Sequence, residues 1–231
     1  VLDPGSFVPN SVDLRNDGVR ALVVTGPNMG GKSCFIRQVA LLALMAQMGS
    51  YVPAAAAELT VLDGVYTRMG ASDNLAMGSS TFLEEMSECS SILRSATEKS
   101  LVVLDELGRG TSTHDGVAVA HATLDYIISD LKPMCLFVTH YPDVARDLAR
   151  KHRKHCDTQY PSYVEVDEND ENDENGGAEG GAGGGAGGIE FLYRLTPGVA
   201  HRSYGLNVAR MAGLPADVVA AAAARARGME E

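Results

Sequence analysis

A short segment near the start of the chain, Gly26-Pro-Asn-Met-Gly-Gly-Lys-Ser33, restricts the possible folds more than any other feature. It fits the P-loop pattern, in which glycines turn backbone N–H groups around a phosphate, a lysine reaches the β- and γ-oxygens and a hydroxyl ligates Mg²⁺. A β-branched run at 21–25 precedes it, and apolar residues recur at helical spacing over 34–48. In the order strand, loop, helix, the positive end of the helix points at the anion. The predicted nucleotide contacts are Gly26, Pro27, Asn28, Met29, Gly30, Gly31, Lys32 and Ser33.

A second signal is a pair of carboxylates that follows a continuously apolar run. Residues 101–104 are Leu-Val-Val-Leu, a pattern typical of strands buried on both faces, and Asp105 and Glu106 come directly after it. Ligands of α/β proteins bind at the carboxyl ends of such strands. Adjacent residues at a strand end point in different directions. We therefore expect Asp105, with Ser33, to serve Mg²⁺, while Glu106 orients or deprotonates the attacking water.

A third signal is Thr139-His140, which ends the next predicted strand, 134–139. A single histidine at a strand end is usually a solvated or capping residue. His140, however, closes the strand that follows Asp105 and Glu106 along the chain. We therefore predict that its side chain reaches the γ-phosphate and responds to its presence.

The strands alternate with segments of helical periodicity, which predicts an α/β fold with a mostly parallel sheet flanked by helices. The expected helices cover the segments 34–48, 81–96, 116–130 and 142–153. After residue 189 the chain predicts one more strand and then a helix-turn-helix in which Pro215 opens the last helix. The apolar faces of that pair suit packing as well as DNA recognition.

Charge is concentrated in one segment. The formal charge of the chain is −11, but 157–188 contains nine acidic residues and no Lys or Arg, which leaves −2 for the remainder. Within it, 167–188 is an acidic repeat followed by Gly and Ala. Such a composition buries too little apolar area to offset chain entropy, so we predict a disordered insertion between strands. The nearly neutral remainder does not predict a DNA-binding surface.

The remaining bounds are broad. No apolar run is long enough to cross a bilayer, and the first residues show no signal peptide, so we expect a fragment of a longer polypeptide. The four cysteines lack the close spacing of a zinc site, and we expect them to be reduced, in an intracellular protein. They are Cys34, Cys89, Cys135 and Cys156.

The ordered motifs resemble those of the MutS ATPase domain. They are GPNMGGKS, GASDNLAMGSSTFLEEMSE, LVVLDELGRGTSTHDG, FVTHYP and RSYGLNVARMAGLP, and together they cover nearly all of the chain outside the insertion. Within the family, the sequence of these segments is most similar to the eukaryotic branch that forms the large partner of a heterodimer recognising insertion and deletion loops. The resemblance implies an ABC-type P-loop ATPase in which each nucleotide lies between two facing domains.

The same resemblance implies roles for residues that the pattern alone does not single out. Ser80 matches the signature serine that reaches the partner's γ-phosphate, and Arg109 and Thr111 fall in a dimer-interface loop. Phe7 matches an aromatic that stacks on adenine, and Tyr193 lies where the family has a second base contact, although both are equally compatible with ordinary core aromatics. Asn28 matches a residue near the γ-phosphate and the water.

The expected domains are an ATPase domain, 1–204, and a helical dimerisation element, 205–231, because the resemblance assigns dimerisation to the last two helices. The implied cofactors are ATP and Mg²⁺. The implied partners are a second MutS-family subunit, a MutL-type repair protein and DNA, which is bound by segments outside this chain and stimulates hydrolysis. A nuclear location follows from these roles.

Two other functions remain open from the sequence. One is a nucleotide-gated dimerisation module of a meiotic MutS homologue that acts on recombination junctions. The other is an ABC or SMC-type ATPase of transport or chromosome structure. The Ser-Thr-Phe sequence at 80–82 in place of an LSGGQ-like signature, and the lack of long heptad or transmembrane segments, disfavour the latter.

Overall fold

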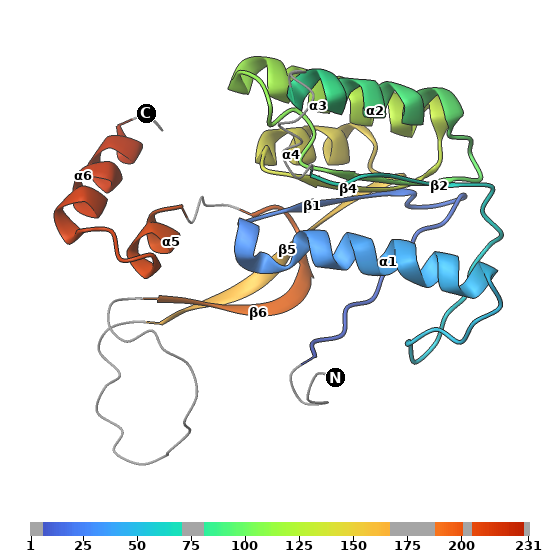
Figure 1. Cartoon of the computed structure of the whole chain (residues 1–231), viewed down its shortest axis with the longest axis horizontal. Helices are drawn as coiled ribbons and strands as arrows, with labels where there is room; N and C mark the ends of the chain where they lie inside the picture. Colours follow the sequence, from blue (N-terminus) through green and yellow to red (C-terminus); the bar gives the residue numbers. More distant parts are fainter. Residues whose placement is uncertain (1–6, 71–80, 167–187, 201–204, 229–231) are drawn as a thin grey trace, which may run out of the picture.

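The computed structural model describes residues 7–70, 81–166, 188–200 and 205–228, which form a six-stranded sheet with helices on both faces (Figure 1). The strand order is β2-β3-β4-β1-β5-β6. All neighbours are parallel except β5 and β6, which are antiparallel. The predicted α/β class with a mostly parallel sheet is therefore confirmed. The strands are β1 (Ala21–Thr25), β2 (Val65–Arg68), β3 (Leu101–Asp105), β4 (Met134–Thr139), β5 (Cys156–Val166) and β6 (Gly188–Pro197).

The helices lie in two layers. In Figure 1, α1 lies on one face of the sheet, and α2, α3 and α4 lie on the other. Their bounds are α1 (Lys32–Gln47), α2 (Thr81–Ser95), α3 (Thr113–Tyr126) and α4 (Pro142–Lys151). Successive residues of a strand pack alternately against the two helix layers. Ala21 and Val23 pack with the residues of α2, α3 and α4, whereas Leu22 and Val24 pack with those of α1. Burial on both faces explains why β1, β3 and β4 are continuously apolar.

Several boundaries differ from those expected. The helix predicted over 116–130 starts at Thr113, because the Ser112 side chain accepts a hydrogen bond from the Asp115 N–H and caps it. It ends at Tyr126 and continues as a π-helical turn, η2 (Ile127–Leu131). Strands β2 and β5 were not predicted. The disordered insertion was predicted over 167–188. All of it except Gly188, the first residue of β6, lies outside the described residues, and β5 and β6 are an antiparallel pair.

The C-terminal residues form two helices, α5 (Gly205–Met211) and α6 (Ala216–Arg227). Pro215 is the N-cap of α6, as predicted for the residue that opens this helix, and the two helices contact each other. Among the described residues, none of the helices combines the length and apolar character needed to cross a membrane.

Candidate active site

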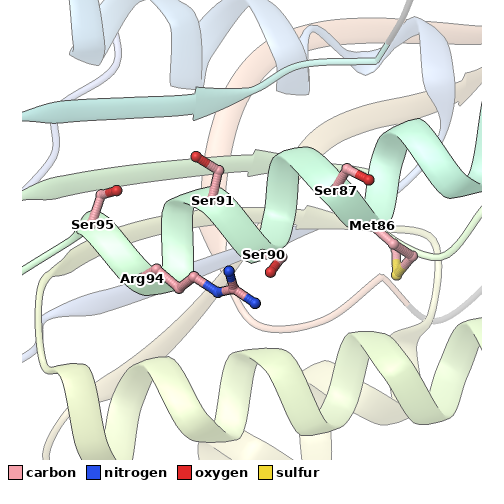
Figure 2. A pocket seen from close by; sticks show the side chains of 6 residues that line it. All are labelled: Met86, Ser87, Ser90, Ser91, Arg94 and Ser95. Carbon is pink, nitrogen blue, oxygen red and sulfur yellow. The ribbon is translucent and has the colours of Figure 1, made fainter.

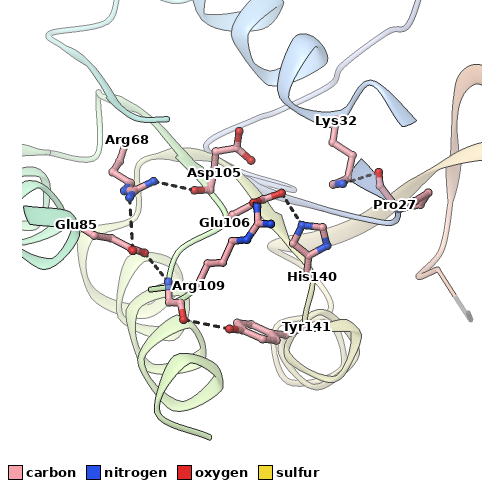
Figure 3. Close-up of polar contacts among 10 residues, drawn as sticks. Pro27, Lys32, Arg68, Glu85, Asp105, Glu106, Arg109, His140 and Tyr141 are labelled. Atoms are coloured by element: carbon pink, nitrogen blue, oxygen red, sulfur yellow. Dashed lines mark hydrogen bonds and ion pairs between the residues drawn. The ribbon is translucent and has the colours of Figure 1, made fainter. Parts of the chain in front are cut away.

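Three predicted motifs meet at the carboxyl ends of three neighbouring strands. Strands β3, β4 and β1 are adjacent and parallel, with Thr25 opposite Thr139 and Asp105 opposite Val138. The segments that follow their carboxyl ends therefore lie together. They supply the loop at 26–31, the two carboxylates and His140, as Figure 3 shows.

The loop at 26–31 depends on its glycines. Gly26 and Gly31 have φ of 124° and 82°, values that side-chain-bearing residues rarely adopt. A Cβ atom on Gly30 would lie 2.5 Å from Cγ of Pro161, a residue of β5 that packs behind the loop. Asn28–Gly30 form a single 3-10 turn, η1, and Gly31 is the N-cap of α1 without a side-chain cap. The first N–H groups of α1 are thus available to an anion.

Lys32 brings a positive charge into this loop. Its side chain is 2% exposed, and its Nζ donates a hydrogen bond of 2.7 Å to the carbonyl oxygen of Pro27. Burial lowers the pKa of Lys32 to about 8, although the negative charges of Glu106 and Asp105 oppose that shift. The buried ammonium therefore lacks part of the hydration that it would have in water. The negative charge of an anion bound in the loop would compensate for this loss.

Asp105 and Ser33 form the predicted magnesium position. Burial raises the pKa of Asp105, while a hydrogen bond from Ser33 acts in the opposite direction. Oδ1 of Asp105 is buried and has no hydrogen-bond partner among the described residues. A buried carboxylate oxygen without a partner beside a hydroxyl is a suitable donor set for Mg²⁺, which prefers oxygen ligands and keeps several waters. The residues present therefore fit this ion.

Both carboxylate oxygens of Glu106 are engaged. Oε1 lies 2.5 Å from Nε2 of His140, and Oε2 accepts a hydrogen bond of 2.5 Å from Nη1 of Arg109. The hydrogen bond with His140, followed by the other contacts with His140 and Arg109, lowers the pKa of Glu106 to about 2. Glu106 also has a φ of 54°, in the left-handed region. In this arrangement the carboxylate is ionised and is a weak base.

A pocket of about 180 Å³ adjoins the loop on the side of α1 and β6. Phe7 and Tyr193, the two predicted base contacts, both line it, together with Gly31 and Cys34. Asn10 joins its two walls, because its Nδ2 donates to the Tyr193 carbonyl oxygen (2.8 Å) and its Oδ1 accepts from the Leu195 N–H (2.7 Å). The two aromatic residues, 186 positions apart, are thus brought to one cavity beside the loop at 26–31.

The structure brings most predicted site residues together, with differences in exposure. Lys32 and Asp105 are buried, whereas Asn28, Met29 and Arg109 are exposed. Thr111 is half-buried in the segment after Arg109. Ser80 lies outside the described residues, so its predicted place across a dimer interface stays a prediction.

A larger hollow of about 510 Å³ lies elsewhere, along α2 (Figure 2). Serine hydroxyls, one thioether and one guanidinium line it, and it contains none of the predicted site residues. Size alone therefore does not identify the active site. Its lining residues are Met86, Ser87, Ser90, Ser91, Arg94 and Ser95.

The sequence interpretation missed a set of residues that contact the carboxylate turn. Glu85 accepts a hydrogen bond from the Gly108 N–H, Arg68 donates to the Asp105 carbonyl oxygen, and Tyr141 donates to the Gly108 carbonyl oxygen (Figure 3). One signal was available for Glu85. It lies three residues after Phe82 and four before Cys89, so a charged residue occupies the apolar face of α2.

Comparison with known proteins decides the family. The sequence model described as MutS domain V matches residues 22–230, which is nearly the whole chain. The chain belongs to the MutS family. It is 49% identical over 224 residues to the DNA mismatch repair protein Msh3 of Homo sapiens, and 51% identical over 226 residues to the msh3 protein of Aspergillus fumigatus. The msh3 protein of Aspergillus clavatus is 52% identical over 226 residues.

These alignments cover 97–98% of the chain but 19% of each relative, so the chain spans about a fifth of their length. The predicted resemblance to the MutS family is confirmed, and the chain corresponds to domain V of that family. The alternative of a meiotic homologue is not favoured, because these relatives are mismatch-repair proteins by name.

Proposed function

We propose that the chain binds ATP with Mg²⁺ and hydrolyses it to ADP and phosphate at the carboxyl ends of β1, β3 and β4. The observation that carries the proposal is the convergence of a buried ammonium, Lys32, an unpartnered carboxylate oxygen on Asp105 and an ionised Glu106 on one glycine loop. These are a phosphate contact, a metal ligand and a water-orienting group, the three parts that phosphoryl transfer requires.

Binding follows from the positions of these groups. The N–H groups of the loop at 26–31 and of the start of α1 surround the β-phosphate, and Lys32 exchanges its bond to Pro27 for the phosphate oxygens. Ser33 and Asp105 hold Mg²⁺, which when bound neutralises charge on the phosphates. The base enters the pocket between Phe7 and Tyr193.

Hydrolysis requires a rearrangement at Glu106. Water attacks the γ-phosphorus, the bond to the bridging oxygen breaks, and the proton of the water passes to a carboxylate oxygen of Glu106. Since Arg109 and His140 occupy both oxygens, at least one must give way before water can bind there. Arg109 is the more exposed of the two, with a side chain 66% accessible, and is the one we expect to move. Asn28 and His140 then contact the γ-phosphate and the water.

The role of the longer protein follows from its relatives. We propose that the domain works within a DNA clamp that recognises mismatches or loops, that DNA stimulates its hydrolysis, and that it pairs with a second MutS-family subunit. Ser80 of one subunit would complete the partner's site, and α5 and α6, in 205–231, would serve dimerisation, with 1–204 as an ABC-type P-loop ATPase. A MutL-type partner and a nuclear location belong to the same proposal.

The test pairs two substitutions in the intact chain. Lys32→Ala should weaken ATP binding by about 10- to 100-fold, since a charge-assisted hydrogen bond contributes about 1.5–3 kcal/mol. Glu106→Gln should keep ATP affinity and slow single-turnover hydrolysis by about 10²- to 10⁴-fold, because an amide accepts no proton. Lys99→Ala, an exposed lysine before β3, is the control. Unchanged affinity in Lys32→Ala, or parental hydrolysis in Glu106→Gln, contradicts the proposal.

A further inference from the structure

Two buried charges lie against the turn that carries Asp105 and Glu106. Arg68, at the end of β2, and Glu85, on α2, have side chains only 7% and 4% exposed, with Nη2 of Arg68 3.5 Å from Oε2 of Glu85. A buried ion pair is weak evidence for stability, because desolvation of the two charges offsets most of their attraction. A role in fixing local geometry is the best-attested alternative, so the other contacts of this pair are informative.

Those contacts are to the backbone of the turn, at both of its ends. Nη1 of Arg68 donates to the carbonyl oxygen of Asp105 at 3.3 Å, and the N–H of Gly108 donates to Oε1 of Glu85 at 2.6 Å. The hydroxyl of Tyr141 donates to the carbonyl oxygen of Gly108 at 3.1 Å (Figure 3). Both polar backbone atoms of Gly108 are thus held by side chains from other elements.

The turn needs such support. Glu106 has a φ of 54° and Gly108 a φ of 91°, and a Cβ atom on Gly108 would lie 2.5 Å from the carbonyl oxygen of Gly116. A non-glycine residue in the left-handed region is strained and persists where its surroundings determine it. The bonds to Gly108 are part of those surroundings, two residues from the carboxylate of Glu106.

We propose that Glu85 and Tyr141 are positioning residues for hydrolysis: they clamp Gly108 and thereby hold the Glu106 carboxylate in place at the phosphate site. This inference rests on the proposed function. Arg68 lies beside the Glu85 carboxylate that accepts the Gly108 N–H. Tyr141 directly follows His140, so one segment contacts both the side chain of Glu106 and the turn behind it. Neither Glu85 nor Tyr141 belongs to the loop at 26–31, so their loss affects turnover and spares binding.

Two substitutions in the intact chain test the clamp. Tyr141→Phe removes one hydroxyl while its ring stays packed against the core, and Glu85→Gln removes the charge while it keeps the shape. We expect single-turnover kcat to fall about threefold to tenfold in the first and about tenfold to 100-fold in the second, since small misplacements of catalytic groups cost up to about 10²-fold. The Kd for ATP should stay within about twofold in both.

Matched controls exist elsewhere on the chain, one of them on α2 itself. Glu88→Gln removes the exposed carboxylate that also approaches Arg68, at 3.7 Å, and Tyr126→Phe removes an exposed hydroxyl at the end of α3. Both should hydrolyse ATP like the parent.

Each outcome decides the inference. Parental kcat in Tyr141→Phe and Glu85→Gln overturns it, and so does a parallel loss of ATP affinity, kcat and melting temperature, which would indicate a structural role alone. If Glu85→Gln fails to fold, the result for Tyr141→Phe decides. A parent chain that binds no ATP overturns the proposed function, and this inference with it.

Discussion

At the scale of single residues, we expect Lys32 to make the proposed nucleotide binding dependent on pH. Burial lowers its pKa from 10.5 to about 8 in the nucleotide-free chain, whereas phosphate oxygens favour the charged form and raise the pKa again. Binding above pH 8 therefore takes up a proton. We expect ATP affinity to be constant below about pH 7 and to fall by up to tenfold per pH unit above pH 8.

Calorimetry in buffers of different ionisation enthalpy measures this directly. Uptake of close to one proton at pH 9 is the expected result for the parent, and none is expected for Lys32→Ala. A parental Kd that is flat from pH 7 to pH 9.5 contradicts the explanation. The effect on folding has the opposite sign. The unfolded chain binds more protons than the folded one between about pH 8 and 10.5, so the contribution of Lys32 to stability rises with pH there.

The site residues that could be predicted are those that lie next to their identifying motif in the sequence. Lys32 follows its glycines directly, and Asp105 and Glu106 follow their strand. Glu85 and Tyr141 act on the N–H and carbonyl oxygen of Gly108, which lies 23 and 33 residues away. Every non-proline residue has these two backbone groups, so no sequence pattern marks the partner of such a bond.

At the scale of elements, hydrogen bonds from one side chain tie the segment that contains Phe7 to β6 in the part of the chain that the structure describes. Asn10 makes both hydrogen bonds across this junction, and each contributes about 1 kcal/mol net. Asn10→Ala should weaken ATP binding by about threefold to 30-fold and leave the affinity for inorganic triphosphate unchanged, because only the base uses this pocket.

Asn16→Ala, an exposed position in the same segment, is the control. Equal losses for ATP and triphosphate would show that Asn10 supports the phosphate loop and would remove the pocket as the base site.

Strands β3 and β4 were predictable because burial on both faces requires continuous apolar residues. Strand β5 was not. It contains polar residues and Pro161, which lacks a donor for the sheet, and its pairing with β6 shifts register between Pro161 and Tyr163. Pro161, which made β5 unrecognisable from the sequence pattern, is the residue that packs behind Gly30. The pattern of alternating or continuous apolar residues therefore fails at the part of β5 that supports the loop at 26–31.

At the scale of the whole molecule, the four cysteines report on both folding and binding. All four are free thiols, of which Cys34 is exposed and Cys89, Cys135 and Cys156 are at most 4% exposed. Burial raises the pKa of Cys156 to about 12, which further lowers its reactivity. We expect one thiol to react in the folded chain and four in denaturant.

Because Cys34 lines the pocket with Phe7 and Tyr193, ATP with Mg²⁺ should slow its alkylation at least tenfold. Mass spectrometry of the labelled peptide identifies the site. Alkylation of Cys34 at the same rate with and without saturating ATP would place the base elsewhere.

The hairpin of β5 and β6 has a consequence for protein engineering. Val166 and Gly188 are opposite each other in the ladder, so the chain leaves and re-enters the sheet at one point. Lengthening the connection between two paired strand ends changes its closure entropy only slowly. A guest domain whose own termini lie close together, such as a fluorescent reporter, fits the same two attachment points. A labelling domain can thus be inserted between β5 and β6, within the polypeptide, while the strands around the loop at 26–31 keep their register.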